Sequence, residues 1–133
     1  MKKQQLATVT ILEIAYGLLK TGRPRKRPGK PRAEATFDNG YTKAEPTSYR
    51  SAWARNYSLT GALKAAAYSI RREVPAATLS RARVDSINLV IDAINEQDGH
   101  HYISFIEDAD QRIADSRAIL RAVKSAAKEA VAA

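Results

Sequence analysis

The sequence predicts a mainly α-helical fold, organised as a single compact domain of four to five helices. Apolar side chains recur at helical spacing over most of the 133 residues, and alanine is abundant. Glycine and proline, which interrupt helices, gather in one segment, residues 20–32, which holds three of the five prolines. We therefore expect residues 1–133 to form one domain, in which residues 20–48 are a long, irregular, basic loop between the first and second helices.

The first helix is expected over residues 4–20. Leu6 and Leu12 belong to an apolar stripe with the 3.6-residue period, and polar side chains occupy the opposite face. Gly22 and Pro24 follow, and both disfavour continuation of the helix. We interpret the apolar stripe as a face that packs against the core.

A second helical region is expected over residues 49–72, as one helix or two consecutive ones. Ser58 can cap a helix that begins at Leu59, because its hydroxyl accepts a hydrogen bond from a free amide of the first turn. Gly61 inside that helix costs about 1 kcal/mol relative to Ala. Its presence predicts close packing at that point.

Two further helices close the predicted domain. One is expected over about residues 78–96, and its apolar stripe faces the core. Residues 100–106 then fit an extended segment whose apolar side chains cover the core. The last helix is expected to start near Asp108, with Gln111 as its capping-box partner.

The connection after the basic segment contains turn chemistry. Asp38-Asn39-Gly40 is typical of a tight turn, and the β-favouring pairs Thr36-Phe37 and Tyr41-Thr42 flank it. A short hairpin and an irregular loop both fit this pattern. With the basic segment it forms a long non-helical connection, a kind that is usually functional or disordered in compact domains.

Positive charge is concentrated in residues 20–32, KTGRPRKRPGKPR. These thirteen residues carry seven Lys and Arg side chains and no acid, so without them the formal charge of +8 would fall to +1. Proline fixes φ and removes amide donors, which excludes a helix or a central strand, and like charges favour an extended path. We expect a stiff basic ribbon that binds phosphates, because each neutralised phosphate releases condensed counterions.

Within this segment, Thr21-Gly22-Arg23-Pro24 followed by Arg25-Lys26-Arg27 resembles the AT-hook. That motif is built on Arg-Gly-Arg-Pro with basic flanks, and its extended core lies in the minor groove of A·T-rich DNA. Gly22, Arg23 and Pro24 match the core, whereas Thr21 stands in place of the first arginine. The resemblance implies minor-groove contacts, in which glycine allows close approach and Arg23 is attracted by the negative potential of a narrow groove.

A second resemblance covers much of the chain. The stretch Tyr57-Ser58-Leu59-Thr60-Gly61-Ala62-Leu63, and later Ile103-Ser104 with Glu107-Asp108, resemble signature segments of a small helical family from actinobacteria and their phages, whose function is uncharacterised. Gly61, Ala62 and Leu63 match, whereas Tyr57 and Ser58 stand where that family has Trp and Cys. The resemblance implies a helical architecture and a phage or mobile-element origin, without implying an activity.

These observations predict a non-enzymatic nucleic-acid-binding protein whose basic loop contacts the phosphate backbone or the minor groove of DNA or RNA. A phage or mobile-element accessory factor is the role that fits this prediction. The alternative is a protein-binding inhibitor of a host or defence enzyme, whose basic loop docks in an acidic or nucleic-acid-binding groove. A passive solvated loop is a third interpretation. The expected nucleic-acid contacts are Lys20, Arg23, Arg25, Lys26, Arg27, Lys30, Arg32, Arg50 and Arg55.

The last two of these cations lie among aromatic residues. Arg50, Trp53, Arg55 and Tyr57 form a mixed basic and aromatic cluster of the kind on which bases stack. The favoured interpretation, however, places Trp53 and Tyr57 in the core as packing aromatics. Both interpretations stay open from the sequence.

The motifs of common enzymes are missing from the sequence, including a P-loop and a glycine-rich dinucleotide turn. The two histidines, His100 and His101, are adjacent and would point to opposite faces of an extended segment. We therefore expect no catalysis, no metal and no cofactor. Glu13 interrupts the apolar N-terminal stretch, which argues against a secretory signal. We therefore expect a soluble cytoplasmic protein without a membrane partner. In the alternative, the first helix and its basic extension lie on anionic lipid.

Overall fold

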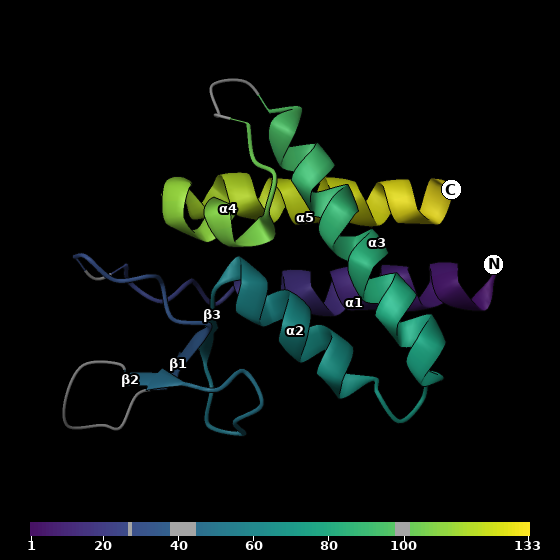
Figure 1. Cartoon of the computed structure of the whole chain (residues 1–133), viewed down its shortest axis with the longest axis horizontal. Helices are drawn as coiled ribbons and strands as arrows, with labels where there is room; N and C mark the ends of the chain where they lie inside the picture. Colours follow the sequence, from purple (N-terminus) through teal and green to yellow (C-terminus); the bar gives the residue numbers. More distant parts are fainter. Residues whose placement is uncertain (27, 38–44, 98–101) are drawn as a thin grey trace.

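The computed structural model describes residues 1–26, 28–37, 45–97 and 102–133, and it confirms a mainly helical single domain (Figure 1). Three short strands lie between the first two helices, in the chain order β1, β2, β3. The described elements are α1 (Lys3–Leu19), β1 (Ala35–Phe37), β2 (Glu45–Thr47), β3 (Asn56–Tyr57), α2 (Leu59–Ser69), α3 (Ala76–Asn95), α4 (Ile106–Arg112) and α5 (Ser116–Ala132).

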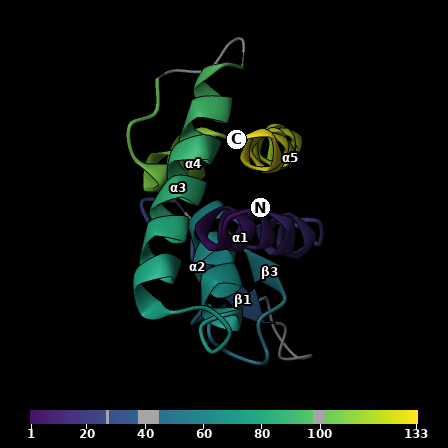
Figure 2. The same cartoon turned by 90° about the vertical axis from the view of Figure 1, so that its right-hand side faces the viewer.

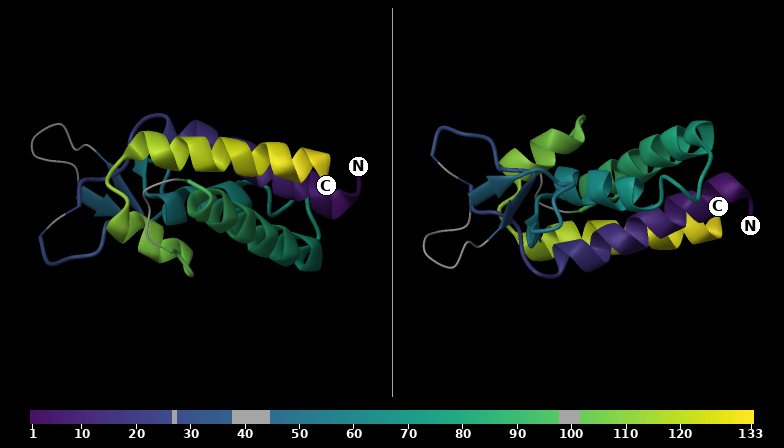
Figure 3. Two further views of the ribbon diagram at one scale, coloured as in Figure 1. Left: turned by 90° about the horizontal axis from the view of Figure 1, so that it is seen from above. Right: turned by 90° about the horizontal axis from the view of Figure 1, so that it is seen from below.

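Helix α1 lies at the centre of the helical layer and packs against α2, α3 and α5. It runs antiparallel to α5, so the two chain ends lie at the same end of the molecule (Figures 1 and 3). Helix α3 crosses this pair at a steep angle (Figure 2). Ile11 and Leu12 are fully buried between these helices, as the apolar stripe predicts, whereas Leu6 is 54% exposed and lies off the core-facing side.

Helix α2 begins as the sequence predicts. The hydroxyl of Ser58 accepts a hydrogen bond from the amide of Gly61 at 3.0 Å, which caps the first turn. The prediction of close packing at Gly61 is also confirmed, because a Cβ atom there would lie 1.9 Å from the carbonyl oxygen of Glu34. Glu34 directly precedes β1, so this contact presses the sheet against the start of α2.

The sheet has the order β2-β1-β3, and β1 is antiparallel to both neighbours. Ala35 pairs with Thr47 on one side and with Tyr57 on the other. The predicted first strand, Thr36-Phe37, is therefore present and pairs with residues 45–47, whereas its predicted partner, Tyr41-Thr42, lies outside the described residues. The predicted turn falls in residues 38–44, outside the described residues.

The last predicted helix is two helices, α4 and α5, separated by residues 113–115. The expected cap near Asp108 is wrong: that residue lies in the first turn of α4, whereas α5 is capped by Asp115, whose carboxylate accepts a hydrogen bond from the amide of Arg117 at 2.9 Å. Ile113 takes an extended conformation and ends α4. The physical reason for this break lies in the contacts of the basic loop, described below.

The segment before α4 covers the core only in part. Ile103 is buried, and Asn95 holds it by hydrogen bonds of 2.8 Å to both its amide and its carbonyl oxygen. Tyr102 and Phe105 point outward, with 75% and 69% of their surface exposed, so the prediction that all apolar residues here cover the core is wrong. His100 and His101 lie outside the described residues. None of the described helices is long and apolar enough to cross a membrane.

Candidate nucleic-acid interface

The predicted loop of residues 20–48 contains β1 and β2, so the name basic loop is kept from here on for residues 20–34 alone. This segment leaves the end of α1 beside the turn that precedes β3. Gly22 has φ +104°, a conformation that favours glycine, and this residue turns the chain out of the helix. The hydroxyl of Thr21 lies 2.8 Å from the carbonyl oxygen of Arg55 and donates to it. The start of the basic loop and Arg55 are thereby held next to each other.

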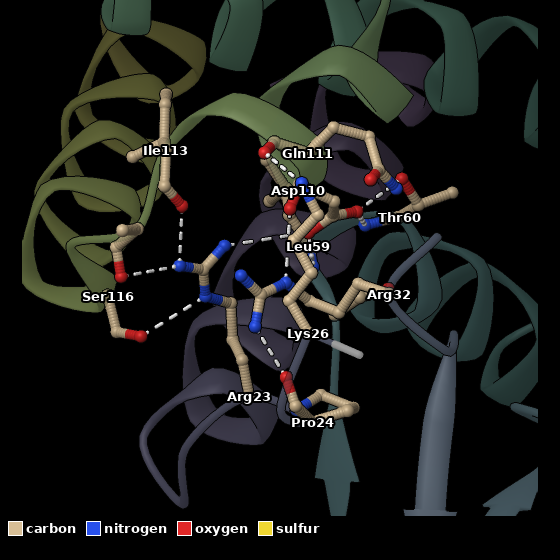
Figure 4. A network of polar contacts seen from close by, with 12 residues as sticks. Arg23, Pro24, Lys26, Arg32, Leu59, Thr60, Asp110, Gln111, Ile113 and Ser116 are labelled. Carbon is tan, nitrogen blue, oxygen red and sulfur yellow. Dashed lines mark hydrogen bonds and ion pairs between the residues drawn. The ribbon is translucent and has the colours of Figure 1, made fainter. Parts of the chain in front are cut away.

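Arg23 is not available on the surface, because only 2% of its side chain is exposed. Its Nε donates to the hydroxyl of Ser116 at 3.1 Å, and one terminal nitrogen donates to the carbonyl oxygens of Ile113 at 2.7 Å and Ala114 at 3.0 Å (Figure 4). Carbonyls at a helix end lack partners within the helix, and a cation is favoured there by the helix dipole. Arg23 thus supplies the hydrogen bonds that the break between α4 and α5 requires.

The second terminal nitrogen of Arg23 faces Asp110 at 3.7 Å, and this carboxylate is 5% exposed. Asp110 also accepts hydrogen bonds from the amides of Leu59 at 2.8 Å and Thr60 at 3.0 Å and from the Thr60 hydroxyl at 2.7 Å, so it caps the N-terminus of α2 (Figure 4). Burial lowers the pKa of Arg23, the charge of Arg32 lowers it further, and Asp110 and Asp115 partly oppose this shift.

Two more cations of the loop bind the protein itself. Lys26 donates from Nζ to the carbonyl oxygen of Gln111 at 3.0 Å. Arg32 donates from Nε to the carbonyl oxygen of Asp110 at 3.1 Å, and from a terminal nitrogen to the carbonyl oxygen of Pro24. The loop therefore closes on itself and lies on α4, which differs from the extended ribbon expected from its prolines and like charges. The reason is that unpartnered carbonyls of the α4 region offer more hydrogen bonds than an isolated ribbon could make.

The remaining cations of the loop point outward. Lys20, Arg25 and Lys30 are exposed, and so is Lys26, whose partner is a neutral oxygen. Among the described residues the ion pairs are Arg23–Asp110 and Lys64–Glu34, so none of these four exposed charges has an acidic partner there. Arg27 lies outside the described residues. The outer side of the loop is accordingly a group of positive charges that have no ion-pair partner within the described part of the chain.

Arg50 and Arg55 extend this group onto the turn of residues 48–55, and both are exposed. The Arg50 guanidinium lies 4.8 Å from the ring centre of Tyr68 and 5.5 Å from that of Tyr49. Its hydrogen bond with the Tyr49 hydroxyl raises the pKa of Arg50. The two rings meet edge to face at 6.3 Å. Arg50 is therefore held in place by aromatic side chains.

The aromatic cluster expected from the sequence is divided by the structure. Tyr57 packs in the core at 9% exposure, as predicted, whereas Trp53 is 73% exposed and the core interpretation is wrong for it. Sequence reasoning did not place Tyr68 and Arg71 together. The guanidinium of Arg71 lies 3.6 Å from the ring centre of Tyr68. Their three-residue spacing at the C-terminal end of α2, with Tyr68 in the helix and Arg71 just beyond it, was the available signal.

A groove of about 600 Å³ lies elsewhere, at the end of the helices away from the basic loop. Gln4, Asp85 and Ala130 line it, and the amide of Gln4 donates to Asp85 at 2.6 Å. In the described part of the chain, no group of three or more His, Asp or Glu residues is arranged to hold a metal ion.

Comparison with protein-family models, curated proteins and solved structures found no significant match. Both resemblances noted in the sequence therefore stay predictions.

Proposed function

We propose that this protein is a non-enzymatic, cytoplasmic nucleic-acid-binding protein. The observation that carries the proposal is that some cations of one loop attach it to the protein while others remain exposed. Arg23 and Arg32 tie the loop to the α4 region, while Arg25 and Lys30 stay exposed without an acidic partner among the described residues. Charges of one sign gathered on a short segment attract a polyanion.

Anchoring matters for affinity as well as for shape. A flexible basic segment loses conformational entropy when it binds, whereas a loop already held by its own hydrogen bonds loses less. Gly29, at φ +70°, provides the turn that returns the loop to the protein. The proposed phosphate contacts are the exposed cations of the loop and of the adjoining turn: Lys20, Arg25, Lys26, Lys30, Arg50 and Arg55. Arg27 is kept as a contact predicted from sequence alone.

A salt titration of binding tests the proposal. Affinity should fall linearly on a log–log plot, with a slope of roughly −0.7 per engaged cation on a single strand and −0.9 on B-DNA. The double variant Arg25→Gln, Lys30→Gln should flatten that slope by about 1.4 on a single strand or 1.8 on B-DNA, because two contacts are lost. Neither side chain forms a hydrogen bond or an ion pair with another residue that the structure describes, so the fold should be unchanged.

The matched control is Arg81→Gln, Lys128→Gln. This double variant makes the same change in net charge, on exposed positions of α3 and α5 away from the loop. Its slope should stay at the wild-type value. Equal slopes for all three proteins would overturn the assignment of the loop as the contact surface, and the absence of any binding at low salt would overturn nucleic-acid binding itself.

A protein-binding inhibitor is the second candidate function. The exposed Tyr102 and Phe105, two large aromatic residues on the segment before α4, favour it, because such side chains are enriched in protein interfaces. This candidate predicts a purified protein free of nucleic acid by its absorbance ratio at 260 and 280 nm. It also predicts that a partner captured by the wild-type protein is lost with Tyr102→Ala, Phe105→Ala.

A further inference from the structure

The turn of residues 48–55 presents an exposed indole next to the basic loop. Trp53 is 73% exposed, and it is the one tryptophan of the chain. A large aromatic side chain buries much apolar area when a ligand covers it, so what the exposed indole can bind depends on the charged groups around it. The turn lies on the side of the molecule away from α5, beside the sheet (Figures 1 and 2).

Hydrogen bonds on both sides of Trp53 hold its backbone in place. The amide of Trp53 donates to the hydroxyl of Ser51 at 3.1 Å, and the amide of Ala54 donates to the Ser51 carbonyl oxygen at 3.2 Å. Arg55 then joins the sheet, because its amide donates to the carbonyl oxygen of Thr36 at 2.9 Å. Ala54 is buried beneath the turn. These bonds hold the backbone of residues 51–55, and the indole of Trp53 lies on the exposed side of the turn.

Cations flank the indole in the chain, and residues 46–57 include no acid. The Arg55 guanidinium folds back along the turn, 3.1 Å from the carbonyl oxygen of Ala54. Arg50, on the other side, is held by Tyr49 and Tyr68. The Thr21 hydroxyl connects Arg55 to the start of the basic loop. An exposed aromatic side chain with a cation before and after it in the chain, and with a basic loop joined to the same turn, is the combination of groups that binds unpaired nucleotides.

We infer that the ligand of this surface is single-stranded nucleic acid, with a base stacked on Trp53 and the adjoining phosphates on Arg50 and Arg55; the inference rests on the function proposed above. A base inside a duplex is already stacked on both faces and cannot lie on an indole. The arginine that would enter the minor groove of a duplex, Arg23, is enclosed with 2% of its side chain exposed. The surface thus fits a splayed strand better than a duplex.

Because the chain has one tryptophan, its fluorescence reports directly on this contact. The test titrates the protein with oligothymidylate, oligouridylate and a duplex, each about 12 nucleotides or base pairs long. The two single strands distinguish DNA from RNA. Stacking should quench the Trp53 emission, protect it from iodide, and follow the same binding curve as the anisotropy of a labelled strand, whereas the duplex should leave the emission nearly unchanged.

The variant Trp53→Ala should weaken single-strand binding about 5- to 150-fold, the range that loss of one stacked base produces. Its salt slope should not change, because no phosphate contact is lost. Trp53→Phe should retain most of the affinity. The matched control is Tyr102→Ala, which removes an equally exposed aromatic residue, 75% against 73%, from the segment before α4.

The outcomes separate this inference from the proposed function. Quenching by a single strand together with weaker binding of Trp53→Ala supports both. Salt-dependent binding without quenching, and with Trp53→Ala equal to wild type, overturns the stacking inference and leaves the phosphate contacts standing. Absence of binding to all three probes at low salt overturns both.

Discussion

The guanidinium of Arg23 lies 3.7 Å from the carboxylate of Asp110, and the two side chains are 2% and 5% exposed. This pair joins the loop after α1 to α4, and the same carboxylate caps the first turn of α2. Both charges have been removed from water, so each depends on the other and on the surrounding hydrogen bonds for its stabilisation. The stability of the fold is therefore sensitive to substitution of Arg23, a residue that the sequence predicted as a nucleic-acid contact on the surface.

Replacement of Asp110 by Asn should lower the free energy of unfolding by about 3 kcal/mol. The amide keeps one oxygen for the donors at the start of α2, but its NH2 group would face the remaining donors, and Arg23 would lose its counter-charge. Urea denaturation followed by circular dichroism measures the change. Asp92→Asn, on an exposed position of α3, is the control and should stay within about 0.5 kcal/mol of wild type.

Replacement of Arg23 by Lys should loosen the basic loop while keeping its charge. A lysine cannot reach Ser116, Ile113 and Ala114 together, because it lacks the planar fork of the guanidinium. Loss of one to two hydrogen bonds makes local opening about tenfold more frequent. Trypsin should then cut after Arg25 and Lys26 about tenfold faster, as mass spectrometry of timed digests would show.

The control for the digestion is Arg25→Lys, which keeps a trypsin site at an exposed position of the same loop. Its cleavage rate should match that of the wild-type protein. If Arg23→Lys were also cleaved at the wild-type rate, the contacts of Arg23 would not be what holds the loop.

The local signals in the sequence predicted the fold well. The apolar period of α1 and the Ser58 cap act within a few residues, so each can be recognised without knowledge of the tertiary structure. A glycine inside a predicted helix likewise indicates close packing, although its partner, Glu34, is distant in the chain and is known only from the structure. The break between α4 and α5 could not be recognised in this way. It leaves the carbonyl oxygens of Ile113 and Ala114 without helical partners, and their hydrogen bonds come from Arg23, which is far away in the chain.

The candidate site was predicted only in part for the same reason. Gly22-Arg23-Pro24 fits a surface motif by its composition, and nothing adjacent in the sequence indicates that Asp110 encloses the arginine. Trp53 and Tyr57 have similar sequence surroundings, yet one lies on a turn and the other on a strand that faces the core. Exposure of an aromatic side chain depends on that pairing and not on its neighbours in the chain.

Gly61→Ala should destabilise the protein, because the added methyl group would lie 1.9 Å from the carbonyl oxygen of Glu34, which is backbone and cannot rotate away. Separating α2 from the sheet enough to admit it should cost about 1–3 kcal/mol in unfolding free energy. Gly17→Ala is the matched control, since a Cβ atom there meets nothing within 4 Å. Gly17 lies in the last turn of α1, where replacement of glycine by alanine should stabilise by at most about 0.5 kcal/mol. Thermal unfolding measures both changes. If the two variants shifted the melting temperature in the same direction, the close approach of Gly61 to Glu34 would not be the cause.

Replacement of Thr21 by Arg would complete the Arg-Gly-Arg-Pro core of the AT-hook in the sequence, and this tests the burial of Arg23 directly. Thr21 is exposed, so the larger side chain has room, although the hydrogen bond to Arg55 would be lost. The added cation should steepen the salt slope on B-DNA by about 0.9. It should not create a preference for A·T-rich over G·C-rich duplexes, because minor-groove insertion needs the central arginine and Arg23 is held by Asp110 and Ser116.

Binding to the two duplexes at several salt concentrations measures both effects. Thr21→Gln serves as the control, since it removes the hydroxyl without adding charge and should leave the slope at the wild-type value. A clear A·T preference of Thr21→Arg would contradict the expectation, because it would require Arg23 to leave its buried site on binding. Such release would leave the buried carboxylate of Asp110 without its counter-charge, so Thr21→Arg should gain less thermal stability from the A·T-rich duplex than a non-selective complex of equal affinity would.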